Sequence, residues 1–368
     1  MLMNYLKSPA WWAGIGVAVL VAVSAGYAAD WVGTSVLGFG TSPISAIMMA
    51  ILIGIVIGNV FTLPQGLRDG LRFCSSTILK LGIILLGIRL SLFGAGKFTL
   101  VALPFVIAAI AIALLTVGFL GRRLGLSRQL AGLIAIGTSI CGCTAIVATA
   151  PLIKANDAEV SYAVACVTLF GVVAMFSYPL LAHYAFAADP ELAGLFLGTS
   201  IHETAQVAGA GMMYEAQYNA PRALDIATVT KLVRNLCMVA VVPIVGILYG
   251  GERTSGQSTR VNWLRMIPWF IVGFAAMSAL RTVGDLGDQA FGFMNTETWG
   301  AIVERVKFAA EACLLIAMSA VGLTSALAGI IRIGLRPFVL GLFAAVLTGV
   351  VSFLLIANYA ESLLQALS

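Results

Sequence analysis

The sequence predicts an all-α polytopic membrane protein with an inverted-repeat architecture, and three observations lead to this fold class. Apolar residues make up 60% of the 368-residue chain and charged residues only 10%, with a mean hydropathy of +1.02. A soluble domain is usually about 45–50% apolar and about 25% charged. Apolar segments of membrane-spanning length recur along the whole chain, and one Gly- and Thr-containing motif occurs twice.

Eleven apolar segments approach the roughly 20 residues that a helix needs to cross the hydrocarbon core. Helices are expected because lipid offers no hydrogen-bond partners to backbone groups. No stretch is long and polar enough to be a soluble domain, so we expect residues 1–368 to form a single transmembrane transporter domain. The segments lie at 11–29, 43–61, 71–93, 98–120, 128–153, 159–184, 191–214, 224–249, 263–282, 298–328 and 337–359.

The positive charges orient these segments, because lysine and arginine are retained in cytoplasmic loops. Lys7 places the N-terminus in the cytoplasm, and the loop at 283–297, which lacks Lys and Arg, is expected outside. Lys97 is the one notable exception to the alternation. We therefore expect a multi-pass protein of the bacterial inner membrane. The expected cytoplasmic arginines are Arg68, Arg72, Arg122, Arg123, Arg128, Arg253, Arg260, Arg265, Arg332 and Arg336.

The internal repeat predicts two irregular segments. Residues 137–150 read GTSICGCTAIVATA and residues 198–210 read GTSIHETAQVAGA, with nine matching positions and one gap. Transporters are often built from inverted repeats whose broken helices meet near the midplane. If the segment 128–153 enters and returns on the cytoplasmic side, the two motifs run in opposite directions and Lys154 stays inside. We therefore expect nine full crossings and two broken or re-entrant segments.

Both GTSI motifs favour a break in the helix, since Gly, Ser and Thr continue a helix poorly. A break exposes amide groups at the start of the next half-helix, where an anion can bind. Unwound carbonyls can hold a cation equally well, and close helix packing is a purely structural alternative. The candidate substrate-binding residues of the two breaks are Gly137, Thr138, Ser139, Gly142, Gly198, Thr199 and Ser200.

Ionisable residues follow the second motif directly. His202 and Gln206 share a helix face, and Glu203 lies beside them. A charged group at mid-membrane costs about 2.5–3.5 kcal/mol on insertion scales, so it usually faces a cavity or a partner. His202 or Glu203 could carry coupling protons. A structural polar network between helices is the alternative.

Three polar residues of the next segment complete the candidate site. Lys231, Arg234 and Asn235 are spaced i, i+3 and i+4 and share one helix face. They could bind an anion, or pair with Glu203. Alternatively, they sit near the membrane edge and extend their charged ends to water.

The remaining chemistry-bearing residues favour structural roles. Glu304, Lys307 and Glu311 share one face of the tenth segment and suggest a self-satisfied triad. With only two histidines and no P-loop, the chain shows no enzyme signature, and we expect no catalytic residue, cofactor, metal site or nucleic-acid partner. The cysteines are expected to be small buried hydrophobes: Cys74, Cys141, Cys143, Cys166, Cys237 and Cys313.

The two GTSI blocks, with the later VTKLVRN, resemble the YeiH-type family of bacterial inner-membrane proteins, which are described as sulfate exporters. The resemblance runs from the second span to the last. It implies a fold similar to that of bile-acid symporters and cation/proton antiporters, and export of a small inorganic or sulfur-containing anion. The family commonly has a small residue where this chain has Cys143, so no role for a cysteine pair is carried over.

Three functions are therefore open at the level of the sequence. The first is secondary transport of a small anion such as sulfate or sulfite. The second is a cation/proton or organic-acid carrier that uses Glu203 and Glu311, and the third is a membrane scaffold or sensor without transport. The expected partners are a small anionic solute and the lipid bilayer, and the sequence is compatible with a homodimer.

Overall fold

The computed structural model describes residues 8–36, 45–187, 189–249, 268–287, 289–325 and 334–366. These residues form helices joined by turns and short irregular links, and one isolated antiparallel bridge joins Ala290 and Met294. Several residues used for orientation lie outside the described part, so their placement stays a prediction: Lys7, Arg253, Arg260, Arg265 and Arg332.

Within the described residues, each of the eleven predicted segments contains helix, which confirms an all-α polytopic membrane protein. Two shorter apolar helices cover Ala46–Val60 and Trp269–Gly284, and the two GTSI segments are each divided into two helices. Within the described residues, seven helices are long and apolar enough to cross a membrane: Pro9–Val36, Gln65–Arg89, Leu92–Arg123, Asp157–Ala185, Pro221–Ile247, Thr296–Thr324 and Leu335–Ala366.

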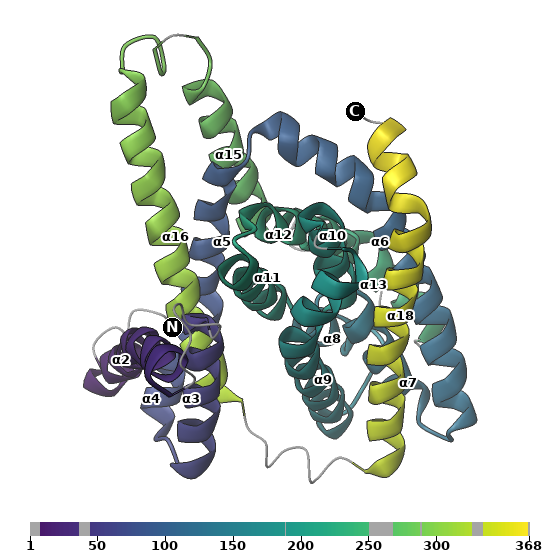
Figure 1. Cartoon of the computed structure of the whole chain (residues 1–368). Helices are drawn as coiled ribbons and strands as arrows, with labels where there is room; N and C mark the ends of the chain where they lie inside the picture. The colour runs from purple at the N-terminus through teal and green to yellow at the C-terminus, as the bar shows by residue number, and fades with distance from the viewer. Residues whose placement is uncertain are drawn as a thin grey trace. The chain divides into compact units, whose positions relative to one another are not determined.

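The chain forms two compact units, and it passes between them several times. The first unit contains Met1–Ala95, Met212–Pro221 and Trp269–Ala328. Its long helix α16 packs along α3 and α5, and α2 packs on α3 and α4 (Figure 1). The helices of this unit are α2 (Pro9–Trp31), α3 (Ala46–Val60), α4 (Gln65–Phe73), α5 (Leu79–Leu86), α15 (Trp269–Gly284) and α16 (Thr296–Thr324), with π-helical turns at Val32–Val36 and Cys74–Ile78 and a 3-10 turn at Gly87–Arg89.

Glycines bring two helix pairs of the first unit into backbone contact. A Cβ added to Gly322 of α16 would lie 2.5 Å from the Ile51 carbonyl oxygen, and one added to Gly54 of α3 would lie 2.8 Å from the Ser319 carbonyl oxygen. Gly14 and Gly70 make an equally close contact between α2 and α4. Small residues are the usual means of close packing in a membrane, where the hydrophobic effect does not drive helices together.

The predicted triad on α16 is divided between two partners. Lys307 pairs with Glu304 at 2.7 Å, whereas Glu311 pairs with Arg89 at 3.3 Å. Arg89 also binds Glu215 at 2.6 Å. The triad prediction was wrong for Glu311, because spacing along one helix cannot reveal an arginine supplied by another part of the chain.

The second unit contains Gly96–Gly211, Arg222–Pro268 and Gly329–Ser368. Its last helix, α18, packs against α7, α9 and α10 (Figure 1). Its helices are α6 (Leu92–Arg123), α7 (Arg128–Ser139), α8 (Cys143–Thr149), α9 (Asp157–Ala185), α10 (Pro190–Ser200), α11 (Thr204–Tyr218), α12 (Pro221–Leu236), α13 (Met238–Tyr249) and α18 (Leu335–Ala366), of which α6, α11 and α12 have one end in the first unit.

The segment 128–153 returns to the end of the unit at which it enters. Ser127 caps the start of α7 and also hydrogen-bonds Glu159, in the first turn of α9, at 2.5 Å. The chain therefore runs in through α7, reverses at the GTSI motif, and comes back through α8 to begin α9. This is the hairpin that the charge pattern predicts.

The second GTSI segment forms a hairpin from the other end of α9. Asp189 caps α10 just after α9 finishes at Ala185. Glu191 at the start of α10 pairs at 2.7 Å with Arg222 at the start of α12, so this hairpin also returns to the end at which it enters. The two hairpins therefore enter the second unit from opposite ends, which is an inverted repeat.

The outward surfaces of the long helices are apolar. On α6, Leu100, Ile107 and Leu115 are more than half exposed, and on α18 Val346 and Leu354 are as well. Exposed apolar side chains that gather on one surface mark an interaction surface. Together with the long apolar helices, it fits lipid contact along the sides of a multi-pass membrane protein.

Substituting Gly322 by Ala should destabilise the first unit, because the new methyl group would meet the α3 backbone. Overpacking of this kind costs about 1–3 kcal/mol. Gly300 lies on the same helix with open space around it, so Gly300→Ala is the matched control and should not lower stability. Melting of the purified variants in detergent measures both, and an equal loss for the two would contradict the close contact.

Candidate functional site

The first GTSI motif breaks the helix between α7 and α8. Ile140 has φ −121° and ψ −93°, and Gly142 has φ +69°. Residues with a Cβ rarely adopt a positive φ. A Cβ at Gly142 would also lie 2.4 Å from Cγ of Glu203. The break therefore requires glycine both for its backbone angle and for the close approach of Glu203.

The hydroxyl groups of the two motifs are bound in the same way in both hairpins. Thr138 Oγ1 donates to the Ile134 carbonyl at 2.8 Å, and Thr199 Oγ1 donates to the Leu195 carbonyl at 2.7 Å. The hydroxyls of the adjacent Ser139 and Ser200 also donate four residues back in their own helices. The hydroxyl groups are therefore hydrogen-bonded within their own helices. The groups of the motifs that bind other parts of the chain are mainly main-chain carbonyls.

The two motif glycines permit close packing. A Cβ at Gly137 would lie 2.7 Å from Cδ1 of Ile146, and one at Gly198 would lie 2.6 Å from Cβ of Thr230. Gly137 thus brings α7 against its return helix α8, while Gly198 brings α10 against α12. These contacts agree with the structural alternative, in which the two glycines serve close helix packing.

Lys231 joins the ends of both broken helices. Its Nζ donates to the Ile140 carbonyl at 2.8 Å, to the Ile201 carbonyl at 2.9 Å and to the His202 carbonyl. The side chain is fully buried. The last carbonyls of a helix lack partners within the helix and carry the negative end of its dipole. One ammonium group therefore satisfies carbonyls from two helix ends with its three donors.

Arg234 makes a second and parallel set of bonds. Its Nε donates to the Ser139 carbonyl at 2.7 Å, and Nη1 donates to the Thr199 carbonyl at 2.5 Å. Nη1 also reaches the Ile201 carbonyl at 3.1 Å, and Nη2 donates to the Thr138 carbonyl. Lys231 and Arg234 therefore hold the carbonyl ends of α7 and α10 together, and their donors bind carbonyls rather than the Glu203 carboxylate.

Glu203 lies at the opposite, amino ends of the return helices. It directly precedes α11, and its Oε1 accepts from the Cys143 thiol of α8 at 2.6 Å and from the Thr168 hydroxyl of α9 at 3.2 Å. Its own N–H donates to Gln206 Oε1 at 3.2 Å, half of a capping box. A carboxylate in this position complements the positive ends of two helix dipoles.

Gln206 ties this group to α9. Its Nε2 donates to the Thr168 carbonyl at 3.1 Å. A Cβ at Gly171, one turn further along α9, would lie 2.0 Å from Gln206 Oε1. The amide is therefore held between α9 and the start of α11, with no room for a larger residue at position 171.

His202 and Asn235 present buried polar atoms without a partner. His202 is 1% exposed, and neither ring nitrogen hydrogen-bonds any described residue, although the Thr138 carbonyl is near. Asn235 is 2% exposed; its Nδ2 donates to Thr204 Oγ1 at 3.1 Å, and its Oδ1 is unpartnered. Buried polar groups are almost always hydrogen-bonded. No described residue satisfies these atoms of His202 and Asn235.

The structure brings all thirteen predicted residues to one region of the second unit, with different tasks. The GTSI residues supply backbone and packing, and Lys231 and Arg234 bind carbonyls. Glu203 accepts from Cys143 and Thr168, whereas His202 and Asn235 carry unpartnered polar atoms. Sequence reasoning missed Thr168, which lies in no motif, and treated Cys143, inside the first GTSI repeat, as a small buried hydrophobe. Cys143 is only partly buried, and its thiol donates to Glu203.

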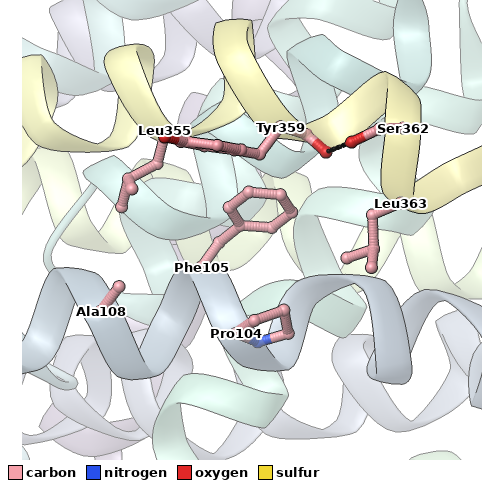
Figure 2. A pocket seen from close by; sticks show the side chains of 7 residues that line it. All are labelled: Pro104, Phe105, Ala108, Leu355, Tyr359, Ser362 and Leu363. Carbon is pink, nitrogen blue, oxygen red and sulfur yellow. Dashed lines mark hydrogen bonds between the residues drawn. The ribbon is translucent and has the colours of Figure 1, made fainter.

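A groove of about 370 Å³ lies elsewhere in the second unit, between α6 and α18 (Figure 2). Figure 2 shows the Phe105 ring between the two helices, with Tyr359 and Leu355 above it and Pro104 beside it. The lining residues are mostly apolar and include none of the predicted site residues: Pro104, Phe105, Ala108, Leu355, Tyr359, Ser362 and Leu363. None of the polar side chains described at the two breaks lines this groove.

Replacing Arg234 by Met should strongly destabilise the protein, because carbonyls of both α7 and α10 lose their partner. Removing one partner of a buried charge cluster costs on the order of 3–5 kcal/mol. Arg222→Met on the same helix is the matched control, since Arg222 is largely exposed and pairs with Glu191; it should cost about 1 kcal/mol at most. Thermal melting in detergent compares them, and equal losses would mean that the carbonyl bonds are dispensable.

Comparison with known proteins places the chain in a family of membrane proteins. Residues 13–341 match the family model described as Conserved hypothetical protein 698. The chain is 30% identical to a UPF0324 membrane protein of Bacillus cereus over 344 residues, with 93% of each chain covered. It is 32% identical to one from Streptococcus agalactiae, covering 83% of this chain and 87% of the relative. These matches confirm the resemblance to the YeiH-type proteins, and the chain belongs to the UPF0324 family of membrane proteins.

Proposed function

We propose that the protein is a secondary transporter that moves a small anion across the bacterial inner membrane, with the two helix breaks as the binding site. The observation that carries this proposal is the position of Lys231 and Arg234, two buried cations at the meeting point of two broken helices. A membrane protein without a transported solute has little reason to place such groups away from water. Discontinuous helices around a buried polar site are typical of secondary transporters.

The local charge supports an anion. Lys231 and Arg234 contribute two positive charges, and Glu203 contributes one negative charge. The solute would contact the unpartnered ring of His202, Oδ1 of Asn235 if the solute carries a proton donor, and amide groups at the start of α11. Amides at a helix start are suited to an oxyanion. Sulfate and sulfite are the first candidates because of the family resemblance.

The cation-carrier alternative has less support. The unwound carbonyls that would hold a cation are already bound by Lys231 and Arg234. Glu311, the second carboxylate of that hypothesis, belongs to the first unit and pairs with Arg89. A scaffold without transport would not need two breaks, each with its own glycine-rich motif. Cytoplasmic placement of the N-terminus and a homodimeric assembly remain part of the proposal.

His202→Phe should abolish anion binding with little loss of stability, because the His202 ring makes no hydrogen bond to the described residues. Thermal-shift titration of purified protein with sulfate, sulfite and thiosulfate measures binding. A ligand at 100 times its dissociation constant stabilises the fold by about 2.7 kcal/mol. Flux of the anion that binds is then followed in proteoliposomes.

His183→Phe is the matched control, since His183 is the only other histidine and lies in the last turn of α9. It should leave binding and flux unchanged. Absence of any anion-dependent shift in the unmodified protein, together with sodium-dependent uptake of an organic acid, would replace the proposal by the cation-carrier alternative.

A further inference from the structure

The charges at the two breaks do not balance. On the carbonyl side, α12 provides the two cations Lys231 and Arg234. On the amino side, Glu203 is the carboxylate, with the neutral groups Cys143 and Thr168 as its hydrogen-bond donors. Among the described residues, His202 precedes Glu203 in the chain, and Cys141 lies near enough to interact with it electrostatically. With these in their neutral forms, the site carries one positive charge.

The helix ends do not change this sum. The carbonyl ends of α7 and α10 carry partial negative charge, and the amino ends of α8 and α11 carry partial positive charge. These ends oppose one another in sign, so the charged side chains leave one positive charge in excess. Asp225 of α12 is not counted, because it lies six residues before Lys231, about 9 Å along the axis, and half a turn around the helix from Arg234.

The excess charge distinguishes anions by valence. An uncompensated charge is costly inside a protein that excludes water. A monovalent anion brings the occupied site to neutrality without any other change. A divalent anion leaves one negative charge over, which the uptake of one proton from solution would remove.

Two groups could take this proton, and their surroundings differ. The His202 ring is 1% exposed, and Lys231 binds the main-chain carbonyl of the same residue, so a proton on this ring would add a positive charge beside a cation. Glu203 is partly exposed, and its Oε1 is held by a thiol and a hydroxyl. A protonated Glu203 could in turn donate to the Thr168 hydroxyl. Glu203 is therefore the better proton acceptor of the two, because a proton neutralises its charge and because it is less buried than His202.

We propose that the site takes up one proton with each divalent anion and none with a monovalent anion, and that Glu203 carries this proton. The inference rests on the proposed function, since it assumes that an anion binds at the breaks. It assigns the coupling proton to Glu203 rather than to His202, and it makes the coupling ratio depend on the charge of the solute.

Sulfate and methanesulfonate test the proposal as a matched pair, because they share a tetrahedral shape and three sulfonyl oxygens but carry two charges and one. Isothermal titration of the unmodified protein, in buffers with different heats of ionisation, counts the protons taken up. We expect about one proton per sulfate and about none per methanesulfonate. Sulfate affinity should accordingly fall about tenfold for each unit by which the pH rises, while methanesulfonate affinity should not change with pH.

Glu203→Gln identifies the group, because it removes the acceptor and leaves the site with two positive charges. In this variant sulfate should bind without proton uptake and without pH dependence. Glu361→Gln, an exposed change on α18, is the control and should keep the proton count of the unmodified protein. The comparison of the two anions needs no variant, so it stands even if Glu203→Gln does not fold.

Two outcomes would overturn the inference while leaving anion transport intact. One is an equal proton count for sulfate and methanesulfonate in the unmodified protein. The other is a proton count for sulfate that persists in Glu203→Gln, which would assign the proton elsewhere. If neither anion bound the unmodified protein, while sulfite and thiosulfate did not bind either, the proposed function itself would fail.

Discussion

The hydrogen bonds from Lys231 and Arg234 to main-chain carbonyls are the interaction on which the second unit depends. A helix that stops inside a membrane protein leaves carbonyls without partners, and neither lipid nor neighbouring helices readily supply donors. Here two helices stop at the same place, so their negative ends would repel each other. Two cations from one turn of α12 satisfy and neutralise both ends. The breaks, and the polar groups around them, can exist only because of these contacts.

Glu203 completes the same electrostatic pattern from the other side. The return helices α8 and α11 begin close to one another, and a carboxylate between their amino ends offsets the positive charge there. Gly142 makes this possible, because a side chain at that position would occupy the space of the Glu203 methylene groups. The two cations thus lie at the carbonyl ends of α7 and α10, and the carboxylate lies at the amino ends of α8 and α11.

Much of this organisation was predictable from the sequence, for identifiable reasons. The length of the apolar segments predicted the helices. The expected cytoplasmic position of Lys154, together with the duplicated motif, predicted the two hairpins. The three-residue spacing of Lys231 and Arg234 placed them on one face. What they bind was not predictable, because the carbonyls of Ile140 and Ile201 have no signature in the sequence. Cys143 and Thr168 were missed for a related reason, since their role comes from proximity to Glu203 rather than from any local pattern.

The sharing of Arg234 between the two hairpins has a consequence for how the protein can change over generations. Here the carbonyl ends of α7 and α10 draw on the same guanidinium group. A substitution at that one codon damages both copies together, whereas a change in α9 at Thr168 reaches only the amino side. The two hairpins therefore repeat one shape, but both depend on the same arginine side chain.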